Sequence, residues 1–171
     1  MKSTVNKATK VVHTKSGQWI PKKAQNSVVG SCIHGKTAGI VGKSASGKFG
    51  PSYLVKVIQA GLPVKELEDL QVSLDVPMEK LACKLGISKS TLHRRKARGK
   101  LDADESDRVV RFARVMGKAV EVMESEENAR RWLTSPQFGL GGAVPLDYAE
   151  TEVGAREVED LLGRIEYGVY S

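Results

Sequence analysis

Cysteine, aromatic residues and long apolar runs are all scarce in this sequence. The two cysteines, Cys32 and Cys83, make no disulfide framework, and so few thiols favour a reducing cytoplasm as the compartment. No apolar run approaches the roughly 18–20 residues that span a bilayer, and the first residues lack the apolar segment of a signal peptide. These absences exclude a membrane protein and predict a cytoplasmic one with no membrane partner.

Acidic residues are absent from the first fifty positions, which contain nine lysines. Residues 51–100 hold ten basic and five acidic side chains, whereas residues 101–171 hold eight basic and fifteen acidic ones. The formal net charge of +7 therefore averages a basic front and an acidic rear. We expect short apolar runs such as Val28-Val29 to bury nothing, and residues 1–50 to form a basic, disordered arm.

The rest of the chain has the pattern of a helical protein. Apolar residues recur at helical spacing from Tyr53 onward, and the alternation typical of strands is missing. The 171 residues suffice for one compact domain or for two small ones. We therefore predict an all-α fold, in which a domain built around a helix-turn-helix at Met78–Leu92 occupies residues 51–101. A small, helical second domain is expected over residues 102–171.

Local signals place the ends of several helices. Ser88 is positioned to cap one helix, and Asp102 with Glu105 three residues later forms a capping box at the start of the longest helix. Ser125 and Thr151 are positioned to cap the two helices that follow. The second domain is thus predicted to consist of one long helix, a short helix, a Gly-rich loop and a final helix.

The segment from Met78 to Leu92 has the spacing of a helix-turn-helix. Ala82 is small enough for the second helix to cross closely, and Gly86 permits the positive φ of a tight turn. The predicted apolar wedge between the helices consists of Leu81, Leu85, Ile87 and Leu92. The alternative is a helical hairpin whose second helix only carries a solvated basic face.

The second helix of this motif, Lys89–Arg98, has hydroxyls near its N-terminus and cations along its length. Such side chains suit phosphate contacts and base-edge readout in a major groove. Arg95 departs from the usual pattern, because the position three beyond Leu92 is ordinarily apolar. The predicted DNA contacts are Lys89, Ser90, Thr91, His93, Arg94, Arg95, Lys96 and Arg98.

Several short patterns resemble catalytic or metal sites, but the residues around them lack the groups that such sites need. Residues 42–48 have the G-x-x-x-x-G-K spacing of a phosphate-binding loop, but the next residue is not the Ser or Thr that holds Mg²⁺. Cys32 and His34 are too isolated for a zinc site, and Cys83 is expected on the core side of its helix. His93 has no paired nucleophile and acid nearby. We therefore predict a protein that is not an enzyme and uses no cofactor or metal.

Segments spread over about Tyr53–Ser171 resemble the Xre-type antitoxins of type II toxin–antitoxin systems. The resemblance includes the MbcA/ParS-like C-terminal toxin-binding domain found in RES–Xre modules. It is carried by Leu85–Ser88, Thr91–Arg95, Leu101, Glu105–Arg108, Ala113–Val115, Ala129–Leu133, Gly141-Gly142, Pro145-Leu146 and Gly154–Gly168. The string from Ala129 onward is more specific than the helix-turn-helix, and residues 1–50 lie outside the pattern.

This resemblance implies a toxin partner with a RES domain that consumes NAD. It implies that the C-terminal region covers the NAD pocket of that toxin, while the N-terminal half dimerises, binds operator DNA and represses its own operon. A homodimer within a larger hetero-oligomer is expected, and the NAD chemistry belongs to the partner. The toxin-facing residues implied by the resemblance are Arg156, Glu157, Asp160, Arg164, Tyr167 and Tyr170.

The residues themselves fit this reading but leave alternatives open. An acidic rear with a Gly-rich loop, Phe138 and Leu140 near it, and two tail tyrosines suits a protein-binding surface, because aromatic side chains anchor interfaces. The main alternative is a plain helix-turn-helix regulator whose C-terminal half only dimerises or senses a ligand. A third is a nonspecific nucleic-acid binder that relies on the basic arm.

Overall fold

The computed structural model describes residues 12–13, 19–20, 27–34 and 51–169 of the chain. Apart from two paired strands, β1 (Val12–His13) and β2 (Trp19–Ile20), these residues form helices and their connections, which confirms the all-α prediction. The helices are α1 (Val28–His34), α2 (Pro51–Ala60), α3 (Val64–Leu74), α4 (Met78–Lys84), α5 (Lys89–Arg98), α6 (Ala103–Met123), α7 (Glu126–Thr134), the 3₁₀ turn η2 (Phe138–Leu140), α8 (Pro145–Tyr148) and α9 (Glu152–Glu166).

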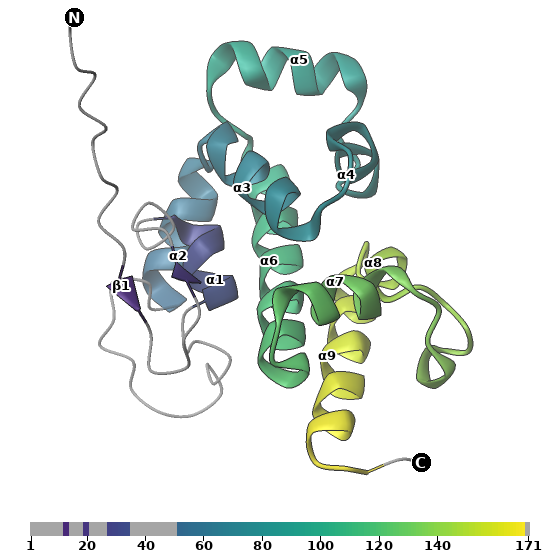
Figure 1. Ribbon diagram of the computed structural model, residues 1–171. Coiled ribbons are helices and arrows are strands. Elements are labelled where there is room, and N and C mark those ends of the chain that lie inside the picture. The colour runs from purple at the N-terminus through teal and green to yellow at the C-terminus, as the bar shows by residue number, and fades with distance from the viewer. Residues whose placement is uncertain (1–11, 14–18, 21–26, 35–50, 170–171) are drawn as a thin grey trace, which may run out of the picture.

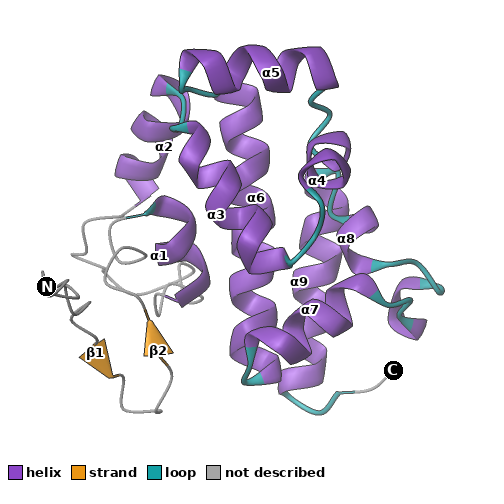
Figure 2. Ribbon diagram, turned by 45° about the horizontal axis from the view of Figure 1, so that its top comes forward, coloured by secondary structure: helices purple, strands orange, loops and turns teal. Residues whose placement is uncertain are grey.

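Helix α6 is the central element of the bundle. It contacts α1, α2 and α3 from the first half of the chain and α7 and α9 from the second half (Figure 1). Its stripe of Val109, Phe112, Ala113 and Met116 is fully buried, as the helical spacing of these residues requires. Helix α5 lies at one end of the molecule, and the C-terminal end of α9 lies at the other (Figures 1 and 2).

The predicted caps are present. The hydroxyl of Ser88 accepts a hydrogen bond from the amide of Thr91, and the Oγ1 of Thr151 accepts one from the amide of Gly154 at 3.0 Å. The amide of Asp102 donates to Glu105 Oε2 at 2.9 Å, which is the capping box at the start of α6. Local signals therefore determine where α5, α6 and α9 begin.

The expectation that Val28-Val29 bury nothing is wrong. Both side chains and Ile33 are buried against the core, where α1 packs on α3 and α6. The carboxylate of Glu66, in α3, accepts hydrogen bonds from the amides of Val28 at 3.0 Å and Val29 at 2.8 Å. This carboxylate supplies the acceptors that the first turn of α1 lacks, because a helix leaves its first amides without partners. Residues 1–11, 14–18, 21–26 and 35–50 of the predicted arm lie outside the described residues.

Helix α1 crosses α6 at Gly117, where the two backbones nearly touch. A Cβ atom at Gly117 would lie 2.1 Å from the carbonyl oxygen of Cys32, so only glycine allows this approach. We expect Gly117→Ala to lower the free energy of unfolding by about 1–3 kcal/mol, because α1 and α6 must separate.

Urea unfolding monitored by circular dichroism measures this loss. The control is Gly163→Ala in α9, where an added Cβ meets nothing within 4 Å. A helix gains about 0.5–1 kcal/mol from such a change, so the control protein should be at least as stable as the wild type. Equal stability of the Gly117→Ala protein and the wild type would contradict the close crossing.

The expectation that Cys83 lies on the core side of its helix is wrong. Cys83 is exposed, because the buried face of α4 is formed by Leu81 and Ala82 and Cys83 points away from it.

Of the described helices, none combines the length and the apolar character needed to cross a bilayer.

Candidate functional site

The turn between α4 and α5 has the helix-turn-helix geometry that the sequence predicts. Gly86 has a φ of +65°, and the amide of Ile87 donates to the carbonyl of Ala82 at 2.8 Å. The guanidinium of Arg108, in α6, donates to the carbonyl of Leu85 at 2.8 Å and so holds the end of α4. The apolar wedge is buried as predicted, at Leu81, Leu85, Ile87 and Leu92.

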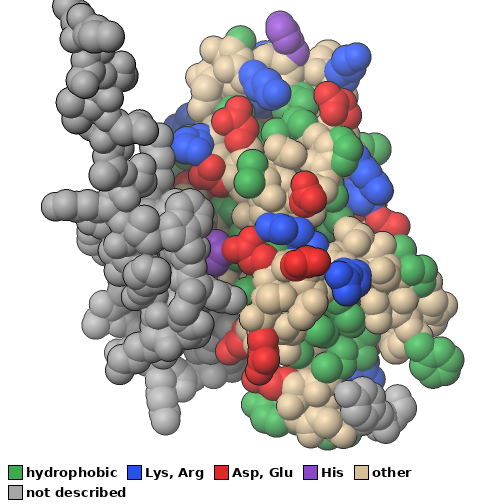
Figure 3. Space-filling view, in the orientation of Figure 1, with side chains coloured by type: hydrophobic (Ala, Val, Ile, Leu, Met, Phe, Trp, Pro, Cys, Tyr) green, Lys and Arg blue, Asp and Glu red, His purple; other side chains and the backbone are tan. Residues whose placement is uncertain are grey.

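Helix α5 presents a polar, cationic surface at its end of the molecule. The space-filling view shows Lys, Arg and His side chains at the top, where Figure 1 places α5 (Figure 3). Thr91 is half-buried, and the exposed side chains among the predicted contacts are Lys89, Ser90, His93, Arg94, Lys96 and Arg98. Their contact with DNA stays a prediction, but their exposure allows it.

Arg95 is not part of this surface, and its place in the predicted DNA-binding set is corrected. Its side chain is buried at 6% exposure, and its Nε donates to Glu105 Oε2 at 2.8 Å. Its Nη2 is paired with Asp102, and the hydrogen bond to Glu105 raises the pKa of Arg95 above its ordinary value. A position that is usually apolar can hold this guanidinium because the capping-box carboxylates of α6 neutralise it.

We expect Arg95→Ala to lower the melting temperature by several degrees, since it leaves the buried Glu105 carboxylate without its cation. Arg94→Ala, one position away on the exposed face, should leave the melting temperature unchanged. Differential scanning calorimetry distinguishes the two variants. If both melt like the wild type, Arg95 has no structural role.

Helix α9 is fixed on α6 by an apolar seam and a row of ion pairs. Its buried face contains Ala155, Val158 and Leu162. Acids at seven-residue intervals on α9 pair with cations on α6, as Arg111–Glu152 at 3.0 Å, Arg114–Glu159 at 2.6 Å and Lys118–Glu166 at 2.7 Å. Burial works against the charge of Glu152, yet Arg114 and Arg111 hold the pKa of its carboxyl below the ordinary value. These acids are therefore engaged within the molecule.

The implied toxin-facing residues lie on the opposite face of α9, with two exceptions. Arg156, Glu157, Asp160 and the 79% exposed Tyr167 face solvent, Arg164 is half-buried, and Tyr170 lies outside the described residues. Arg156 pairs with Glu152 at 3.2 Å, and Arg164 pairs with Glu157 at 3.5 Å. Asp160 has no ion pair within the described part of the chain, so its charge remains available.

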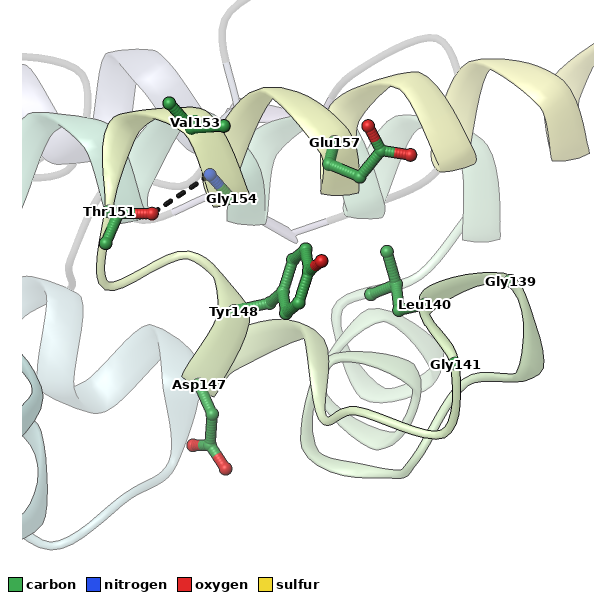
Figure 4. Close-up of a pocket in the computed structure, with 9 residues that line it drawn as sticks. All are labelled: Gly139, Leu140, Gly141, Asp147, Tyr148, Thr151, Val153, Gly154 and Glu157. Atoms are coloured by element: carbon green, nitrogen blue, oxygen red, sulfur yellow. Dashed lines mark hydrogen bonds between the residues drawn. The ribbon is translucent and has the colours of Figure 1, made fainter.

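A groove of about 680 Å³ lies beside this face, between η2, α8 and the first turns of α9. Tyr148, Val153 and Glu157 are among its lining residues, and Figure 4 shows the Tyr148 ring beside α9, the helix that carries Val153 and Glu157. Val153 is 80% exposed, Tyr148 is 42% exposed and Phe138, next to the groove residue Gly139, is fully exposed. The toxin-facing residues implied by the sequence do not include these apolar side chains. The Gly-rich loop next to Phe138 is the sequence signal that points to the groove.

Comparison with known proteins agrees with this two-part organisation. Residues 54–114 match the family model described as the antitoxin Xre-like helix-turn-helix domain. Residues 118–168 match the antitoxin Xre/MbcA/ParS C-terminal toxin-binding domain, so the two matches meet within α6, beside Gly117.

Curated relatives cover the same region. An "Antitoxin Xre" of Yersinia enterocolitica is 37% identical over 120 residues, which are 69% of this chain and 81% of the relative. An "Antitoxin Xre" of Photorhabdus laumondii is 36% identical over 121 residues, 70% of this chain and 82% of the relative. A "Prs ADP-ribosylating antitoxin" of a Sphingobium species is 24% identical over 127 residues, 68% of this chain and 80% of the relative. With these identities and both domain matches, the chain belongs to the Xre family of antitoxins.

Proposed function

We propose that this antitoxin neutralises a RES-domain, NAD-consuming toxin by covering its active site with the C-terminal region, and that it represses its own operon through α5. The observation that carries the proposal is the union, in one chain, of an exposed cationic α5 and a matched toxin-binding domain over residues 118–168. One relative is named for ADP-ribosylation, and ADP-ribosyl groups derive from NAD, which supports the choice of toxin class.

The charges of α9 support its role toward the toxin. Because α6 engages Glu152, Glu159 and Glu166, the outward face presents only Glu157 and Asp160 as acids, and Glu157 pairs there with Arg164 at 3.5 Å. Carboxylates on an outward face attract cationic side chains at the rim of a protein partner, whereas they repel a phosphate backbone. We include Arg156, Arg164, Tyr167 and Tyr170 in the same contact.

The position of α5 supports its role toward the operator. It lies at the opposite end of the molecule from the C-terminal end of α9, so DNA and toxin can be bound together (Figure 1). A homodimer would present two copies of α5 to the two halves of a palindromic site. Helix α2 buries none of its side chains and exposes Tyr53 and Val55, which offers apolar surface for such a dimer.

Growth and transcription together test the proposal. Cells that express a cognate RES-domain toxin should stop growing, and co-expression of the antitoxin should restore growth. A reporter driven by the promoter of the operon should be repressed by the same protein. Repression without restored growth would favour the plain transcriptional regulator instead.

A further inference from the structure

Phe138 is a fully exposed aromatic residue on a turn that is otherwise well anchored. Its whole side chain is open to solvent, whereas its neighbour Leu140 is buried. Single exposed apolar residues are common on protein surfaces, so exposure alone indicates nothing. Here, however, Phe138 lies beside a groove whose walls carry two further exposed apolar side chains, Tyr148 and Val153.

The loop that carries Phe138 is held in one conformation by its own hydrogen bonds. The amide of Gln137 donates to the carbonyl of Ala143 at 3.0 Å, and the amide of Gly142 donates to the carbonyl of Gln137 at 2.9 Å. The side-chain amide of Gln137 also donates to the carbonyl of Trp132 at 2.9 Å. A side chain presented on such a fixed loop loses little conformational entropy on binding.

The next residue, Gly139, fits the loop against α9. A Cβ atom there would lie 2.6 Å from Cδ1 of Leu161, so the backbone of the turn packs directly on this helix. The turn therefore holds Phe138 outward while it rests on the same helix that carries Glu157 and Asp160.

We propose that Phe138, with Tyr148 and Val153 beside the groove, is the apolar anchor of the toxin contact; this patch is called the Phe138 patch below. The proposal rests on the proposed function, because its occupant is the toxin. The toxin would supply an apolar pocket for the Phe138 ring and Lys or Arg side chains for the groove carboxylates, Asp147 and Glu157.

The family match and continuity favour the toxin over a second copy of this chain. Phe138, Tyr148 and Val153 all lie within residues 118–168, which match the toxin-binding domain. Glu157 both lines the groove and belongs to the toxin-facing set, so the Phe138 patch continues that surface.

Binding of the purified full-length antitoxin to its toxin tests the patch. We expect Phe138→Ala to weaken the complex at least about 30-fold, the loss typical of a central anchor residue. Val153→Asp serves as a second variant of the same patch, with a similar expected loss. Val72→Ala, an exposed apolar residue of α3, is the matched control and should bind like the wild type. Melting temperature and operator binding should be unchanged in all three variants.

The possible failures are distinguishable. If the wild type binds toxin and both patch variants bind equally well, the Phe138 patch is not the anchor, while the proposed function stands. If the wild type itself binds no toxin, the proposed function fails and the anchor fails with it. If Phe138→Ala changes the oligomeric state of the antitoxin alone in sedimentation velocity, the patch is covered by a second copy and the proposal is overturned.

Discussion

Replacing Lys89, Arg94, Lys96 and Arg98 together with alanine should weaken binding to operator DNA about a thousandfold near 0.1 M salt. Each phosphate contact contributes about 0.9 to the slope of log affinity against log salt, so four lost contacts reduce the slope by about 3.6. If α5 and the basic N-terminal segment together neutralise about six phosphates, the wild-type slope is near −5. All four side chains are exposed, so the fold should be retained.

Fluorescence anisotropy with DNA from the promoter of the operon, at several salt concentrations, measures both quantities. Arg131→Ala is the control, because Arg131 is an exposed cation on α7, away from α5. An unchanged salt slope in the fourfold variant would show that α5 does not contact the phosphate backbone. An equal loss in the control would show that only total charge matters.

Reversing the charge of Glu157 and Asp160 together should abolish neutralisation of the toxin. Both carboxylates face solvent on α9, and neither takes part in the ion pairs between α9 and α6. Cations placed at a surface that meets cations cost several kcal/mol, so we expect Glu157→Arg with Asp160→Arg to weaken the complex about a hundredfold or more.

Isothermal titration calorimetry with the toxin measures the affinity, and growth of co-expressing cells measures neutralisation. The control is Glu127→Arg, a charge reversal at an exposed position of α7. Its affinity should match that of the wild type. A double variant that still restores growth and binds tightly would place the toxin contact on another face.

Features that depend on neighbouring residues could be predicted from the sequence. The bounds of α5, the hydroxyl cap at Ser88 and the capping box at Asp102 all follow from side chains within a few positions of each other. The wedge of the helix-turn-helix follows from helical spacing in the same way. The matched family domains confirm that this local reading gave the right architecture.

Features that depend on distant residues could not be predicted in this way. Helix α1 is docked because Glu66 lies close to its first turn, and this carboxylate is 37–39 positions further along the chain. Arg95 is drawn into the core by acids of the next helix, so its type alone placed it wrongly among the DNA contacts.

The Phe138 patch belongs to the same class of tertiary features. It exists only because a turn, α8 and α9 come together in space. The packing of α9 on α6 has a clearer pattern in the sequence: acids on α9 recur every seven residues and their partners on α6 every three or four, which indicates two helices packed along their length.

Several contacts join the two family matches, among them the hydrogen bond from Arg130 Nε to the carbonyl of Ser73 at 2.6 Å. Helix α6 extends through both family matches, and Lys84 of α4 pairs with Asp147 and, at 3.6 Å, with Glu150 in the second half. The surfaces proposed for DNA and for the toxin are therefore parts of one packed body, although they lie at opposite ends of it (Figure 1).

The central proposal is that this chain protects NAD from a toxin partner. The most direct measurement is the NAD content of cells that express the proposed RES-domain toxin, with and without the antitoxin. We predict that NAD falls with the toxin alone and stays at the level of control cells when the antitoxin is present. NAD that falls equally in both cultures, with both proteins expressed, would contradict the proposed function.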